Sequence, residues 1–115
     1  MPIHLITEKA APEQMREMLV VLGSYIKLAV DVERSVLAGG GELHADCESV
    51  LLEDGSEQDN VWGADWFPHT RETTFESMIN YRPRLGFDSM ELQDEILRFR
   101  IKEITETLLG GLNIA

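Results

Sequence analysis

The sequence has only one cysteine, Cys47, and it lacks any long apolar run. A single cysteine excludes an internal disulfide framework and favours a reducing compartment, so we expect the protein in the cytoplasm. No stretch approaches the roughly 20 apolar residues that a membrane-spanning helix needs, and no basic-then-apolar leader precedes Pro2. These features predict a soluble cytoplasmic protein without a membrane anchor or an export signal.

Positive charge is also scarce. The chain has 10 Lys and Arg against 21 Asp and Glu, which gives a formal net charge of -11. A surface with this excess of negative charge repels phosphate-rich partners. We therefore expect the protein to bind neither nucleic acid nor acidic membranes.

What the chain does contain is ordinary globular composition. Hydrophobic residues make up 43% and charged residues 27% of the 115 residues, and a chain of this kind folds without metal or disulfides. We find no internal repeat, low-complexity tract or linker that would divide it. The sequence therefore predicts a single α+β domain over residues 1–115.

Two helices are predicted, one near each end of the chain. The first runs from about Pro12 to Leu22, because proline suits the first helical position and apolar residues then recur at helical spacing. The second begins at Asp88, which has capping-box spacing with Glu91, and ends at Gly110. This second helix is the longest predicted element. Its apolar stripe comprises Leu92, Ile96, Phe99, Ile101, Ile104 and Leu108.

The arms that flank the three glycines at 39–41 predict a long β-hairpin. Apolar and polar residues alternate from Tyr25 onward, which is the period of a strand. Consecutive glycines enter φ > 0 readily and suit a reversal. A fold-back that places Leu37 opposite Leu43 also matches aliphatic and oppositely charged residues across the two arms. The matched pairs are Leu28 with Leu52, Val30 with Val50, Lys27 with Glu53, and Arg34 with Asp46.

The second arm of this hairpin has an alternative interpretation. Residues Glu42 to Leu52 also carry an apolar stripe at helical spacing, which would place His44 and Glu48 four residues apart on one helix face. In a helix, however, the charge pairs with the preceding arm would be coincidences. We therefore favour the strand and keep the helix as its rival.

Further strands complete the predicted sheet. Ile3 to Ile6 is a short edge or parallel strand, which a right-handed crossover through the first helix could bring beside the Tyr25 arm. Val61 to Phe67 and Thr73 to Tyr81 continue an antiparallel meander after the hairpin. The prediction is a two-layer α+β fold with a mostly antiparallel sheet of four or five strands, an N-terminal helix and a long C-terminal helix.

Apolar residues occupy both faces of this predicted sheet. Trp62 and Trp66 share one face, which in the predicted register is mixed with charged residues. A sheet that is apolar on both sides needs two covers. Either the two helices divide the work or a second copy of the chain covers one side, and we predict a homodimer.

The candidate catalytic residues are His44, Asp46, Glu48 and Asp65. Strand periodicity places the first three on one face, and the register adds Asp65 beside Glu48 and Arg34 beside Asp46. An imidazole among carboxylates suits acid/base catalysis, or a divalent metal held by His44, Asp46 and Glu48. The same side chains also fit a hydrated rim neutralised by Arg34, and no established metal motif is matched. The sequence requires no cofactor.

Four residues are candidates for ligand binding. Arg34 is the counter-ion predicted for the acidic cluster, and Asn80, Arg82 and Arg84 surround Pro83 at a strand end. Guanidinium groups bind phosphate and carboxylate well, so a small anionic ligand is one candidate. The alternative is that these arginines pair with nearby acids and hold the loop before the last helix.

Four strings resemble a small bacterial family of uncharacterised domains. They are LAGGGELHADCESVLLEDGS at 37–56, VWGADW at 61–66, INYRPR at 79–84 and SMELQD at 89–94. The similarity covers roughly Ile3 to Leu109, and none of the strings is a catalytic signature. The resemblance implies a stand-alone bacterial protein of unknown function, and it brings no activity, cofactor or site residue with it.

Two classes of function are consistent with these features. The first is a non-enzymatic binding or interaction module that acts as a homodimer. The second is a small metal-dependent or acid/base hydrolase, in which the His44 cluster does the chemistry and Arg82 or Arg84 binds an anionic substrate.

Overall fold

The structure is a computed structural model, and it describes residues 3–111. Within this range five strands form one antiparallel sheet in the order β1-β3-β2-β4-β5. The strands are β1 (His4–Ile6), β2 (Ile26–Asp31), β3 (Val36–Gly39), β4 (Val61–Phe67) and β5 (Glu72–Thr74). The helices are α1 (Pro12–Met18), α2 (His44–Glu53) and α3 (Glu95–Leu109), with short 3-10 turns η1 (Gln58–Asn60), η2 (Met78–Asn80) and η3 (Pro83–Leu85).

The predicted α+β class, with an N-terminal and a long C-terminal helix, is confirmed. Helix α1 begins at Pro12 as predicted and is shorter than expected, and α3 is the longest helix described, with 15 residues. The predicted start of α3 at Asp88 is wrong. Asp94 caps the helix instead, because its Oδ1 accepts the N–H of Leu97 at 3.0 Å.

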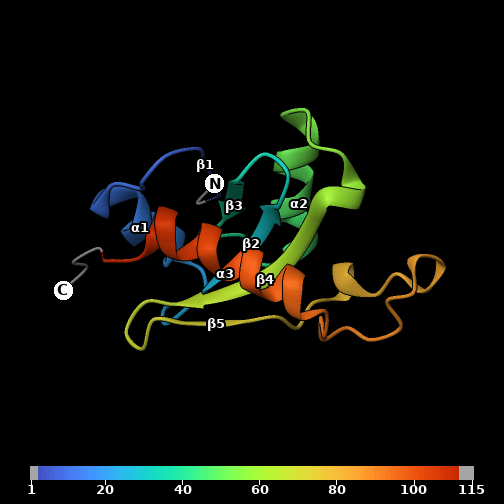
Figure 1. Ribbon diagram of the computed structural model, residues 1–115. Coiled ribbons are helices and arrows are strands. Elements are labelled where there is room, and N and C mark those ends of the chain that lie inside the picture. Colours follow the sequence, from blue (N-terminus) through green and yellow to red (C-terminus); the bar gives the residue numbers. More distant parts are fainter. Residues whose placement is uncertain (1–2, 112–115) are drawn as a thin grey trace.

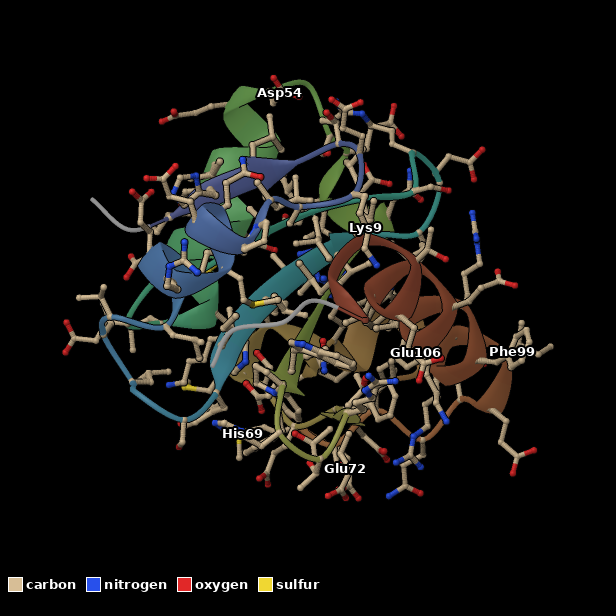
Figure 2. All side chains as sticks on the ribbon, turned by 90° about the vertical axis from the view of Figure 1, so that its left-hand side faces the viewer. Lys9, Asp54, His69, Glu72, Phe99 and Glu106 are labelled. Atoms are coloured by element: carbon tan, nitrogen blue, oxygen red, sulfur yellow. The ribbon has the colours of Figure 1, made fainter. Side chains whose placement is uncertain are left out.

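Two large apolar side chains of α3 are exposed to solvent. Ile96 and Phe99, which the prediction placed in the buried stripe, are 82% and 69% exposed, and Figure 2 shows Phe99 projecting away from the sheet. Both residues lie off the stripe that packs on the core, which comprises Leu97, Ile101, Ile104 and Leu108.

The predicted hairpin at the three glycines is also wrong. The chain reverses earlier, between β2 and β3, where Asp31 Oδ1 accepts the N–H groups of Glu33 and Arg34, both at 2.9 Å. Gly39 lies within β3 and serves close packing. A Cβ atom added there would come within 2.7 Å of Leu28 Cδ2. A glycine suits this position because there is no room for a side chain, and not because the chain turns there.

The helical alternative for the segment after the glycines is correct. Helix α2 buries Cys47 and Leu51 against the small side chains Ala29 and Ala38 of the sheet. The cross-strand pairs predicted for this segment are therefore absent. Arg34 does not meet Asp46. Its Nη2 lies 2.6 Å from Asp54 Oδ2, just beyond the end of α2.

Strand β2 is the centre of the sheet and lies between β3 and β4. It pairs with β4 through contacts such as Leu28 with Ala64 and Val30 with Trp62. β1 and β2 run in parallel but are not neighbours, because β3 separates them. The predicted fourth strand is shorter than expected: β5 ends at Thr74, and the chain then leaves the sheet and forms η2.

Helices lie on both sides of the sheet. Figure 1 shows α3 crossing on one side of β2 and β4, and in Figure 2 the green α2 and the red α3 lie on opposite sides of the teal β2. Trp62 and Trp66 are buried on the α3 side, with Met15 and Met18 of α1 in the same cluster. The second apolar face is thus covered by α2 of the same chain, and a second copy is not needed for that purpose.

Candidate functional site

The inner face of α2 carries two polar side chains one turn apart. His44 and Glu48 are four residues apart and so point the same way, towards β4 and η2. His44 contacts Asp65, and Glu48 faces Arg82. The cluster predicted from the sequence is therefore split into two pairs, and Asp46 lies apart from both as an exposed residue of the first helical turn.

The His44 pair is well satisfied. His44 Nε2 lies 2.8 Å from Asp65 Oδ1 and 3.1 Å from the carbonyl oxygen of Ala64. Both partners are acceptors, so Nε2 is the nitrogen that carries the proton, and Nδ1 is left with its lone pair in the neutral ring. Asp65 Oδ2 accepts the hydroxyl of Thr74 at 3.1 Å. The side chains of His44 and Asp65 are only 11% and 13% exposed.

His44 lines a cavity of about 180 Å³, which we call the His44 cavity. Most of its wall is apolar, and Ser77 is the hydroxyl residue in it. Ser77 Oγ accepts the N–H of Ile79 at 3.3 Å and so caps η2. The lining residues are Lys27, Leu43, His44, Ala45, Ser77, Met78 and Ile79.

Arg82 is held in place mainly by backbone carbonyls. Its Nε donates to Ile79 at 2.9 Å and its Nη1 to Gln58 at 3.0 Å, while Nη2 donates to Val61. The guanidinium carbon also lies 4.1 Å from the centre of the Trp62 ring. Burial lowers the pKa of Arg82, and the nearby carboxylates act in the opposite direction.

Glu48 is less well satisfied than Arg82. It is 9% exposed, and Arg82 Nη2 lies 3.9 Å from Glu48 Oε2, which is too long for a hydrogen bond. Among residues 3–111, no group donates to this buried oxygen. Because buried polar atoms in folded proteins are nearly always hydrogen-bonded, this oxygen is an exception, and the guanidinium charge of Arg82 at 3.9 Å offsets its burial only in part.

Glu48 lines a second cavity, of about 250 Å³, which we call the Glu48 cavity. Its wall comprises Glu48, Gln58, Asp59, Ile79, Tyr81 and Arg82. Ile79 lines both this cavity and the His44 cavity. The two cavities share this residue of η2, and each is lined by residues of α2, so we name them together the α2–η2 groove.

Asn80 and Arg82 form hydrogen bonds with backbone groups on the outer edge of β4. Strand β5 covers only residues 65–67 of that edge. At Gly63, the Asn80 amide replaces a neighbouring strand: Oδ1 accepts the Gly63 N–H at 2.8 Å and Nδ2 donates to the Gly63 carbonyl at 3.0 Å. The amide of Asn80 also donates to Phe75, so its hydrogen-bonding groups are engaged with the backbone.

The other predicted ligand-binding residues lie outside the groove. Arg34 bonds Ser56 and Asp54, and Arg84 is exposed in η3. Within residues 3–111, no three His, Cys, Asp or Glu side chains lie close enough together to hold a metal ion. The convergence predicted for His44, Asp46 and Glu48 as metal ligands is therefore not formed.

Several groove residues were missed from the sequence. The helical alternative for residues 42–52 placed His44 and Glu48 on one face, but it gave neither of their partners. Asp59 and Tyr81 had no comparable signal, because each reaches the groove from a short turn whose path depends on tertiary packing.

Cys47 lies beside the groove residues on α2, but its thiol is unreactive. It is buried, and its thiol donates to the carbonyl oxygen of Lys27 at 3.4 Å. Burial raises the pKa of Cys47 from 9.0 to about 11, so it stays a neutral thiol at physiological pH.

An antiparallel five-stranded sheet with helices on both sides defines a small α+β domain. The family model described as "Protein of unknown function (DUF5674)" matches residues 4–108, and the chain belongs to this family. The predicted resemblance to a family of uncharacterised domains is thereby confirmed. Searches of curated proteins and of solved structures find no match. No helix described between residues 3 and 111 combines the length and apolarity needed to cross a membrane.

Proposed function

We propose that the protein is a non-enzymatic binding module and that it binds a small molecule in the α2–η2 groove. The observation that carries this proposal is the buried Oε2 of Glu48, which has no hydrogen-bond donor among the described residues and belongs to a side chain in the wall of a 250 Å³ cavity. A ligand that donates a hydrogen bond to the Glu48 carboxylate would offset part of the cost of burying it.

The polar groups around the groove support binding more than turnover. Arg82 is fixed by backbone carbonyls, and Asp65 accepts hydrogen bonds at both of its oxygens. Such side chains are already held in one geometry, which lowers the entropy lost when a ligand binds.

The proposal can be tested by NMR with a small-fragment library. Fragments that bind should shift the amide resonances of α2 and η2. The resonances of Ser35 and Thr107, which line a separate cavity beside α3, should stay in place. Ala45→Trp would fill the His44 cavity and weaken binding, whereas Ser49→Trp, at an exposed position on the same helix, should leave binding unchanged. A library that shifts no groove resonance would overturn the proposal.

An acid/base hydrolase is the second candidate. It is supported by one specific observation, namely that His44 is oriented by Asp65 and shares its cavity wall with Ser77. A carboxylate that orients a histidine is the arrangement used by general bases in acyl transfer. Hydrolysis of p-nitrophenyl acetate that His44→Gln lowers at least about tenfold would support this candidate, and equal rates in the two proteins would remove it.

The homodimer and the cytoplasmic location remain predictions. The homodimer was inferred from a sheet face without a cover, and α2 now covers that face. Sedimentation at micromolar concentration tests the oligomeric state, and a single monomeric species would contradict the prediction. Cell fractionation tests the location.

A further inference from the structure

The Glu48 cavity carries an unbalanced negative charge. Its wall has two carboxylates, Glu48 and Asp59, against the single guanidinium of Arg82. The chain as a whole has a formal net charge of -11, so the field around the cavity also favours cations. A ligand with one positive charge would balance the three groups.

The cavity also offers more acceptors than donors. Glu48 Oε2 is a buried acceptor without a donor in residues 3–111. Three of the five N–H groups of Arg82 donate to backbone carbonyls, and these bonds fix the orientation of the guanidinium, so two N–H groups face four carboxylate oxygens of Glu48 and Asp59. This arrangement suits a ligand rich in N–H donors, and it argues against the anionic ligand predicted from the sequence.

The remaining walls suit an organic cation more than a bare metal ion. Tyr81 is half exposed and lines the same cavity, and an aromatic face attracts ammonium groups. Ile79 lines this cavity and also the His44 cavity, where exposed Leu43 and Met78 provide apolar surface. A hydrocarbon group attached to the cation would therefore have a place to bind.

We propose that the α2–η2 groove binds a small primary amine in its ammonium form. The nitrogen lies against Glu48 and Asp59, and the hydrocarbon part lies over Ile79 towards the His44 cavity. This assignment rests on the proposed function, because it names the chemical class of the ligand for the same groove.

The test uses three four-carbon probes of nearly equal size: n-butylammonium, n-butanol and butyrate. Titrated at pH 7 and followed by the amide resonances of α2 and η2, n-butylammonium should bind with a Kd on the order of 1 mM. The neutral and anionic probes should bind at least about tenfold more weakly, because neither brings a positive charge to Glu48. Equal affinity for the amine and the alcohol would overturn the assignment.

Two variants locate the charge. Glu48→Gln keeps the shape of the side chain and should weaken n-butylammonium binding at least about tenfold. Glu53→Gln is the matched control, since Glu53 is an exposed carboxylate on the same helix that lines neither cavity and its loss changes the net charge equally. An equal loss of affinity in both variants would show that only the overall field acts, and this too would overturn the assignment.

The remaining outcomes distinguish a failure of the amine assignment from a failure of the proposed function. If Glu48→Gln does not fold, Asp59→Asn at the exposed rim of the cavity is used in its place. It should weaken amine binding several-fold, and unchanged binding would count against the assignment. Magnesium or calcium that displaces the amine and depends on Glu48 would replace it with a metal site. If other fragments shift the groove resonances and amines do not, this inference fails while the proposed function stands; if no compound shifts them, both fail.

Discussion

The two faces of the sheet are built from different kinds of side chain. The face towards α3 is lined by large apolar residues such as Leu28 and Trp66. The face towards α2 has small residues such as Ala29 and Gly63, with polar groups at its margin. Small side chains let α2 approach the strands closely, and this closeness allows His44 to reach Asp65 at 2.8 Å. We therefore expect the α3 face to supply most of the stability, whereas the α2 face also positions polar groups.

The largest effect should come from truncating the α3 face. Ile101→Ala removes a fully buried side chain and should lower the free energy of unfolding by about 2 to 5 kcal/mol. Ile96→Ala, the same change at an exposed position of the same helix, should cost less than about 0.5 kcal/mol. Urea unfolding measures both. Similar losses in the two variants would mean that the α3 face is not the main source of stability.

The next effect concerns Arg82 at the polar margin. Arg82→Met keeps much of the apolar stem but removes three hydrogen bonds to backbone carbonyls, and it should cost about 2 to 3 kcal/mol in urea unfolding. Arg84→Met, at the exposed position two residues later, should be nearly neutral. A cost at Arg82 no larger than the cost at Arg84 would show that these three hydrogen bonds contribute little to stability.

A smaller effect is expected for the His44 and Asp65 pair. A double-mutant cycle with His44→Gln and Asp65→Asn should give a coupling energy of about 1 to 2 kcal/mol, because both side chains are largely buried. The pair formed by His4 and Glu17 is a natural control. Its 2.7 Å separation is similar, but its side chains are 26% and 54% exposed, so its coupling should stay below about 1 kcal/mol. Equal coupling in the two pairs would remove the distinction drawn for the α2 face.

A further prediction concerns the Cys47 thiol. Its ionisation should not affect stability at neutral pH and should lower stability at alkaline pH. Burial, the main cause, raises the pKa of the thiol from 9.0 to about 11 in the folded protein. The folded state thus holds its proton more tightly than the unfolded state. The stability contributed by the buried neutral thiol is fully present below pH 9 and is lost as the pH rises through about 11. The free energy of unfolding should fall by up to about 2 to 3 kcal/mol over this range.

The difference between wild type and Cys47→Ala isolates this contribution, because other groups that titrate in the same range are common to both proteins. Thermal unfolding from pH 7 to 11 should fall more steeply for wild type than for the variant. Parallel curves would show that burial on the α2 face does not perturb the thiol.

Elements with one strong local signal were predictable from the sequence. Strand β4 has the bounds that its alternation predicted, and Trp62 and Trp66 share a buried face, as expected for residues four apart on a strand. Pro12 marks the start of α1. In each case the local pattern and the tertiary packing favour the same structure, so no long-range information was needed.

Helix α2 shows where such prediction fails. Residues 42–52 fit both a strand and a helix, and the choice was made on charge pairs with the preceding arm. Those pairs are coincidences, because the reversal is made by Asp31 and not by the glycines. His44 and Asp65 were both named as site residues, yet the register placed Asp65 beside Glu48. Their actual contact depends on where α2 packs on the sheet, which the sequence alone does not encode locally.

The outer edge of β4 has a consequence for the behaviour of the protein at high concentration. A strand edge with open N–H and C=O groups can recruit a strand from another molecule and begin fibril growth. At Val61 and Gly63 these groups are already occupied by Arg82 and Asn80. On the part of β4 that β5 leaves uncovered, these groups are therefore not open to a strand from another molecule, and we expect Asn80→Ala, which frees both groups of Gly63, to raise the tendency to form fibrils.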